Sequence, residues 1–147
     1  MKRIIALITL VVAVAVHIAA ATDYGYYVGG VRVTSNNCNN ITGDNITAYS
    51  PSQSYSAVYN PSTKTLTLTN VSIERTGSYN RALYNDTCRG LKVVFVKANR
   101  MEASDSSPLR FNAATTMTSP NGNVSVSGGR VNVSDVTALI NIILGIG

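Results

Sequence analysis

The apolar residues of this chain alternate with polar residues most regularly between positions 57 and 73. The sequence Asn-Pro-Ser-Thr at 60–63 divides that stretch, and its proline presets φ for a turn. In the segment that follows, threonine and leucine alternate strictly from Thr65 to Thr69, a period of two residues. This pattern predicts a β-hairpin. It resumes after Asn70, where we expect a kink or bulge that keeps one apolar face pointing inward.

Short strand-like segments occur along most of the chain between residues 24 and 128. The sequence YGYYVGGVRVT at 24–34 predicts two strands joined at a Gly-Gly turn, and LKVVFVK at 91–97 predicts a buried strand. Similar short segments, bounded by Ser, Asn, Gly or Pro, follow as far as residue 127. They predict an all-β domain, either a short β-solenoid or a β-sandwich built on hairpins. No strict repeat decides between the two.

The spacing of apolar residues becomes helical near the C-terminus. Ser134 is placed to cap a helix and Gly145 to end it, which predicts one short C-terminal α-helix. We expect its apolar stripe to contact either a protein partner or the chain's own β-domain. The residues of this stripe are Val136, Leu139, Ile140, Ile143 and Leu144.

The N-terminus has the pattern of a secretory signal peptide. Two basic residues precede an apolar run from Ile4 to Ile18, and three alanines ending at Ala21 supply a cleavage site. A transmembrane anchor is the alternative, although the run is shorter than the roughly 20 residues that a span needs. The predicted organisation is a cleaved signal helix (1–21), a β-domain (22–128) and a helical tail (129–147). The protein would be secreted or on the cell surface, with no membrane span after cleavage.

Charge and composition narrow the classes of function. Without residues 1–21, ten Lys and Arg and seven Asp and Glu remain, spread along the chain, which argues against nucleic-acid binding. The only histidine, His17, lies in the predicted signal peptide, so Ser-His-Asp catalysis and the usual zinc sites are excluded. No spacing pairs two carboxylates as glycosidases require. We therefore expect no enzyme activity and no cofactor.

Two kinds of residue are candidates for special roles. Cys38 and Cys88 would enter an oxidising compartment together, which predicts a disulfide, with two free buried cysteines as the alternative. Tyrosine has the flat apolar face and polar tip that sugar binding uses, although cross-strand packing uses the same residue. The candidate ligand-binding residues are Tyr26, Tyr27, Tyr55, Tyr59 and Tyr84.

Two stretches resemble known families. Residues 24–128, with YGYYVGGVRVTSNN, YNPSTKTLTLTNVSI and GLKVVFV, resemble extracellular domains usually labelled carbohydrate-binding and built from β-solenoid-like rungs. Residues 131–145, VNVSDVTALINIILG, resemble the calcium-loop exit and helix of a type I dockerin repeat from anaerobic bacteria. These resemblances imply a secreted bacterial protein that binds polysaccharide or is tethered at the cell surface.

The dockerin-like segment departs from its family at the metal site. The first, third and fifth ligand places hold Val124, Val126 and Gly128, which offer no side-chain oxygen. Only Asn132 and Asp135 remain as weak candidate ligands, so we expect no metal. The sequence thus predicts a non-catalytic binding protein, most simply for carbohydrate. The alternative is a structural or adhesive surface module without sugar recognition, and a more remote one is a polysaccharide lyase-like enzyme.

Overall fold

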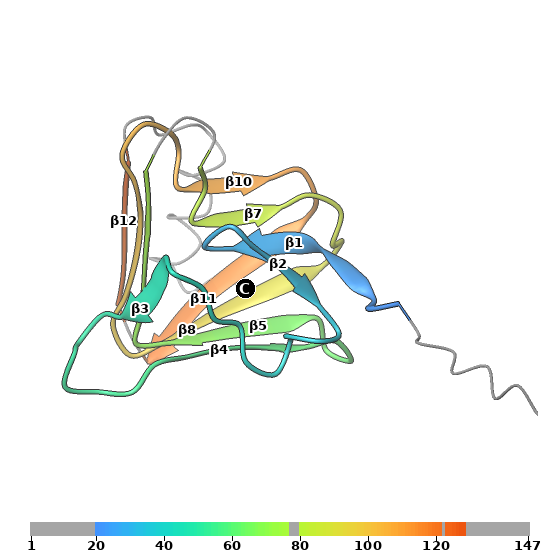
Figure 1. Cartoon of the computed structure of the whole chain (residues 1–147), viewed down its shortest axis with the longest axis horizontal. Coiled ribbons are helices and arrows are strands. Elements are labelled where there is room, and N and C mark those ends of the chain that lie inside the picture. The colour runs from blue at the N-terminus through green and yellow to red at the C-terminus, as the bar shows by residue number, and fades with distance from the viewer. Residues whose placement is uncertain (1–19, 77–79, 122, 129–147) are drawn as a thin grey trace, which may run out of the picture.

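The computed structural model describes residues 20–76, 80–121 and 123–128. Within these ranges the chain forms twelve β-strands in three four-stranded sheets that face a common interior (Figure 1). In chain order the strands are β1 (Asp23–Val28), β2 (Val31–Thr34), β3 (Ile46–Ala48), β4 (Ser56–Asn60), β5 (Thr65–Thr69), β6 (Val71–Arg75), β7 (Leu83–Asn85), β8 (Leu91–Val96), β9 (Asn99–Ala103), β10 (Leu109–Phe111), β11 (Thr115–Asn121) and β12 (Val124–Gly128).

The predicted fold class, an all-β chain that ends in a short α-helix, needs correction. Every helix or strand in the part of the chain that the structure describes is a strand. Residues 134–144, where the helix was predicted, lie outside the described residues, as do residues 1–19 of the predicted signal helix. None of the described residues belongs to a helix long and apolar enough to cross a membrane.

Hairpins are also not the main building unit. The first sheet has the strand order β10-β7-β1-β2, the second β11-β8-β5-β4 and the third β12-β9-β6-β3. The pairs within β5-β8-β11, β6-β9-β12 and β7-β10 are parallel, and the antiparallel pairs involve β1, β2, β3 and β4. The passes β7-β8-β9 and β10-β11-β12 visit the three sheets in the same order. The chain therefore winds in stacked coils around one core.

The core consists of aligned apolar side chains from successive coils. In the second sheet, Leu66 lies opposite Val93, and Val93 lies opposite Met117. All three are buried, as is Phe95, which lies opposite Leu68 on the next inward position. Parallel pairing in this register keeps each inward residue above another inward residue, since side chains alternate with a period of two. The two offsets differ, at 27 and 24 residues, which explains why the sequence shows no strict repeat.

Asn70 forms a corner between two sheets, where a kink or bulge was expected. Its φ of 53° lies in the left-handed region that asparagine tolerates better than most residues. The chain leaves the second sheet at Thr69 and enters the third at Val71. Leu68 and Val71 are both buried, so the corner keeps the apolar face inward, as the alternation had predicted.

Buried asparagines hold the coils together near these corners. Asn99 accepts a hydrogen bond from the backbone nitrogen of Val71 (2.9 Å) and donates to the carbonyls of Val96 (3.0 Å) and Lys97 (3.1 Å). Asn70 and Asn85 are buried as well. Their amides satisfy backbone groups that leave the sheet ladders at the corners, where an unpaired buried group would be costly.

Candidate functional site

The five candidate tyrosines fall into three environments. Tyr26 and Tyr59 are core residues, 0% and 2% exposed, and their rings meet edge to face with centroids 5.1 Å apart. Tyr55 is partly buried and packs against the core. Tyr27 and Tyr84 are half-exposed. Tyr26 and Tyr27 are neighbours on one strand and point to opposite faces. Since Tyr26 and Tyr59 are both buried in the core, neither is placed to contact a ligand at the surface.

The predicted disulfide between Cys38 and Cys88 is absent, because both residues are free cysteines in the structure. Cys38 is buried and Cys88 is half-buried. The Tyr59 hydroxyl lies 3.7 Å from the Cys88 sulfur. Burial, reinforced by Tyr59 and the two thiols, raises the pKa of the Tyr26 phenol well above its ordinary value. The cysteines thus belong to a buried tyrosine cluster.

The Tyr26 hydroxyl is the weak point of this cluster, and replacing Tyr26 with phenylalanine is expected to stabilise the protein. Among the described residues, the buried hydroxyl has no hydrogen-bond partner. We expect Tyr26→Phe to raise the free energy of unfolding by about 1 kcal/mol, because the desolvation of an unpaired hydroxyl is removed. Urea denaturation measures this, with Tyr59→Phe as the control, which should bring no gain because it removes the contact with Cys88. A loss of stability in Tyr26→Phe would contradict the prediction.

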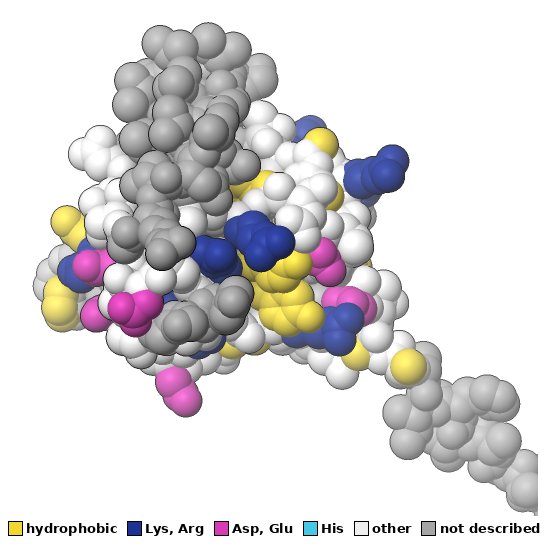
Figure 2. Space-filling view, turned by 90° about the horizontal axis from the view of Figure 1, so that it is seen from above, with side chains coloured by type: hydrophobic (Ala, Val, Ile, Leu, Met, Phe, Trp, Pro, Cys, Tyr) yellow, Lys and Arg dark blue, Asp and Glu magenta, His cyan; other side chains and the backbone are white. Residues whose placement is uncertain are grey.

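The two half-exposed tyrosines belong to a row of four side chains on the first sheet. The strand register places Tyr27 opposite both Arg32 and Tyr84, and Tyr84 opposite Arg110. We call these four residues the arginine–tyrosine row. The row crosses β10, β7, β1 and β2 in order, so its spacing is set by the backbone. Figure 2, which looks down on this side of the molecule, shows Lys or Arg side chains beside a group of hydrophobic ones.

Cation–π contacts hold the row together. The two tyrosine rings are nearly parallel, with an interplanar angle of 15° and centroids 5.8 Å apart. The Arg32 guanidinium lies 5.9 Å from the centre of the Tyr27 ring, and that of Arg110 lies 5.7 Å from the centre of the Tyr84 ring. Both distances are within the range in which the ring quadrupole attracts a cation. A ligand on this surface therefore meets phenol and guanidinium groups together.

An ionised carboxylate with two neutral donors ends the row on the β7–β10 side. Tyr84 donates its hydroxyl to Asp86 (2.8 Å), and the Asn112 amide donates to both the Asp86 carboxylate (2.9 Å) and the Tyr84 hydroxyl (3.0 Å). Hydrogen bonds from Asn112 and then from Tyr84 lower the pKa of Asp86, and the bond to Asp86 raises the pKa of the Tyr84 phenol. At the other end, Asp23 forms an ion pair with Arg32, which lowers the pKa of Asp23.

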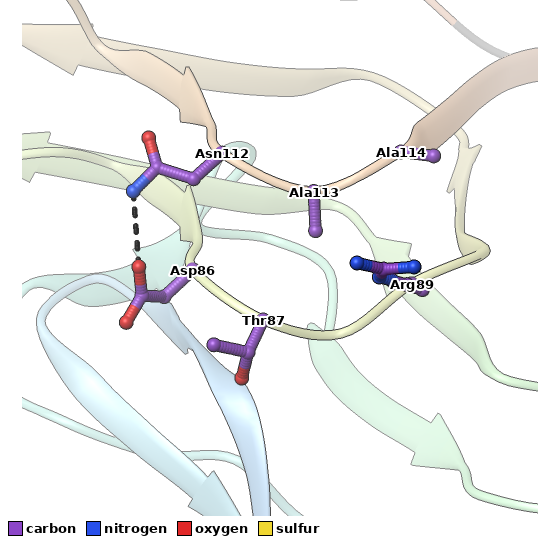
Figure 3. A pocket seen from close by; sticks show the side chains of 6 residues that line it. All are labelled: Asp86, Thr87, Arg89, Asn112, Ala113 and Ala114. Atoms are coloured by element: carbon purple, nitrogen blue, oxygen red, sulfur yellow. Dashed lines mark hydrogen bonds between the residues drawn. The ribbon is translucent and has the colours of Figure 1, made fainter.

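Two depressions adjoin the row. The smaller has a volume of about 200 Å³ and is lined by Tyr27, Gly30, Arg75, Arg81, Tyr84 and Asp86. The larger, shown in Figure 3, has a volume of about 510 Å³ and is lined by Asp86, Thr87, Arg89, Asn112, Ala113 and Ala114. Asp86 lines both, so the two form one extended surface that runs from the Gly29–Gly30 turn to the loop after β10. A ligand of several linked units would fit this length.

Positive charge gathers on this surface. The described residues include nine Lys and Arg and six Asp and Glu. Five arginines and only two acids, Asp23 and Asp86, lie in the row or line its depressions. The other four basic residues are balanced by four acids. We call this group the arginine surface: Arg32, Arg75, Arg81, Arg89 and Arg110.

Sequence reasoning missed the arginine surface, since its members are spread from residue 32 to residue 110 and looked like scattered solvated charges. Only the Tyr27–Arg32 contact could have been predicted from the sequence. These two residues stand on the two strands of the predicted hairpin at 24–34, and outward-facing residues of paired strands become neighbours. The parallel pairing of β7 with β10 placed Arg110 opposite Tyr84, and Arg75 reaches the same surface from β6.

The predicted metal and partner-contact residues cannot be placed in the structure. The weak metal candidates Asn132 and Asp135, and the partner-contact stripe formed by Val136, Leu139, Ile140, Ile143 and Leu144, lie outside the described residues. Within the described ranges, no three His, Cys, Asp or Glu side chains gather as a metal site would require. The arginine–tyrosine row and its two depressions are therefore the candidate functional site.

Comparisons with known proteins add no family to this picture. The resemblances to carbohydrate-binding β-domains and to dockerins remain predictions. No family model matches the chain, and neither the curated proteins nor the solved structures include a match to it.

Proposed function

We propose that this protein is a non-catalytic, secreted or cell-surface protein that binds carbohydrate at the arginine–tyrosine row. The observation that supports the proposal is the in-register placement of two aromatic rings between two guanidinium groups. Sugars carry apolar C–H faces that pack on aromatic rings, and hydroxyl groups that donate and accept hydrogen bonds. The predicted signal peptide supports export.

The polar groups around the row suit the hydroxyls of a sugar. The Asp86 carboxylate accepts hydrogen bonds, the guanidinium groups of Arg32 and Arg110 donate them, and the Asn112 amide does both. Their positions are fixed before a ligand arrives, because Tyr84, Asp86 and Asn112 hydrogen-bond one another and the rest stand on paired strands. A preorganised surface loses less entropy on binding than one that must be ordered by its ligand.

Replacing either tyrosine of the row is expected to weaken binding. We predict that Tyr27→Ala and Tyr84→Ala each lower the affinity for a bound polysaccharide about tenfold, because each removes ring contact and releases an arginine from its place. The measurement is affinity electrophoresis against a panel of soluble plant and bacterial polysaccharides, followed by calorimetry for those that retard the wild-type protein.

Tyr49→Ala is the matched control for these variants. Tyr49 is 46% exposed and lines a different depression, beside Asn70 and Lys97. It should change affinity little. Thermal unfolding of all three variants separates lost binding from lost structure. If wild-type protein binds no polysaccharide in the panel, or if Tyr49→Ala weakens binding as much as Tyr27→Ala, the proposal fails and the adhesive module becomes the better hypothesis.

A further inference from the structure

We propose that the carbohydrate is acidic and that its anionic group, a carboxylate or a sulfate ester, binds Arg89 in the larger depression. This inference rests on the proposed function, because it assigns the chemical class of the sugar and the residue that reads it. The observations that carry it are the cleft around Arg89, the unpaired state of its guanidinium and the charge of the surrounding surface.

The cleft lies between two loops that hydrogen bonds fix in place. One loop connects β7 to β8 and carries Arg89, and the other connects β10 to β11 and carries two alanines (Figure 3). The backbone nitrogen of Gly90 donates to the carbonyl of Ala114 (2.9 Å), and that of Asn112 donates to the carbonyl of Asn85 (2.8 Å). The loops are thus joined on both sides of the cleft. Its volume of about 510 Å³ has room for a sugar unit.

Arg89 differs from the other members of the arginine surface in having no partner among the described residues. Arg32 pairs with Asp23, and Arg110 donates to Asn112 (3.4 Å). Arg75 and Arg81 donate to backbone carbonyls, at 3.1 Å and 2.7 Å. No hydrogen bond or ion pair within the described part of the chain involves the Arg89 guanidinium, which is among the groups that line the larger depression (Figure 3). Its five N–H donors are therefore available to a planar anion.

The surroundings of Arg89 favour an anion. The wall opposite the guanidinium consists of the small side chains of Ala113 and Ala114, so neither an acid nor a bulky group occupies the space. Asp86 is the one acid among the lining residues, and its carboxylate already accepts hydrogen bonds from Tyr84 and Asn112. The Lys64 ammonium donates to the Arg89 carbonyl (3.1 Å) and adds positive charge near the same loop.

A polysaccharide pair that differs only in charge tests this inference. The probes are polygalacturonate and its fully methyl-esterified form, with dextran sulfate and dextran as a second pair that distinguishes sulfate from carboxylate. We expect wild-type protein to bind at least one acidic member about tenfold more tightly than its neutral counterpart, and the difference to shrink as salt rises.

Arg89→Ala should remove that preference, because the affinity for the acidic member should fall about tenfold further than the affinity for its neutral counterpart. Arg100→Ala is the matched control: it changes the net charge equally but lies on the third sheet, where Arg100 pairs with Glu102. Equal affinity for charged and neutral members, or an equal loss in both variants, overturns the assignment of an acidic sugar and leaves the proposed function standing. Binding to none of the four probes and to no other polysaccharide overturns both.

Discussion

Replacing Asn70 with alanine is expected to lower the free energy of unfolding by about 3 kcal/mol, from lost hydrogen bonds and backbone strain. The Asn70 side chain is 2% exposed and holds the loop between β3 and β4 against the corner. It accepts a hydrogen bond from the backbone nitrogen of Ser50 (2.9 Å) and donates toward the carbonyls of Gln53 (3.0 Å), Ser50 (3.2 Å) and Ser54 (3.3 Å). Alanine leaves these groups unpaired.

Asn70→Gly separates the two contributions. Glycine adopts the φ of 53° without strain, so it should be more stable than the alanine variant by about 1 kcal/mol, although it loses the same hydrogen bonds. Urea denaturation gives both values. Asn60→Ala is the control: the exposed Asn60 side chain caps a turn by accepting hydrogen bonds from the backbone nitrogens of Ser62 (2.9 Å) and Thr63 (3.4 Å), so a change below about 1 kcal/mol is expected. If Asn70→Ala loses no more than Asn60→Ala, the corner does not depend on the side chain.

The second large effect is expected at Asn85, where alanine should lower the free energy of unfolding by about 3 kcal/mol, since three hydrogen bonds of a buried side chain are lost. Asn85 is 0% exposed and accepts a hydrogen bond from the Cys88 nitrogen (3.0 Å). Its amide donates to the Cys88 carbonyl (2.9 Å) and to the Thr115 hydroxyl (2.7 Å). It therefore fixes the loop that carries Asp86 and Arg89.

Asn85→Ala should weaken polysaccharide binding as well as stability, because that loop forms one wall of the larger depression. Urea denaturation and calorimetry with the bound polysaccharide measure the two effects on one sample. Asn112→Ala is the companion variant. The substitution should change stability little, because Asn112 is exposed. It should still weaken binding, because the Asn112 amide hydrogen-bonds Tyr84 and Asp86 at the row. A variant at Asn85 that unfolds like wild type would show that the loop is held by its backbone hydrogen bonds alone.

Local sequence patterns were sufficient for many strands and for the turns between adjacent ones. The alternation around Thr65–Thr69 predicted the antiparallel β4–β5 pair, which the structure confirms from Ser56 opposite Thr69 to Asn60 opposite Thr65. The Gly29–Gly30 turn joins β1 and β2 with positive φ at both glycines, as the dipeptide indicated. Such features depend on residues a few positions apart, so a short segment of the sequence is enough to predict them.

The chain by itself thus determined where strands form and which of their faces is apolar, because side-chain alternation and turn chemistry act within a few residues. Tertiary structure alone decided that the coils pair in parallel, that Tyr26 is core while Tyr84 lies at the surface, and that five distant arginines share one face. Parallel pairing joins segments about 25 residues apart through backbone groups common to every residue. The residues of one strand therefore do not indicate which distant strand will pair with it.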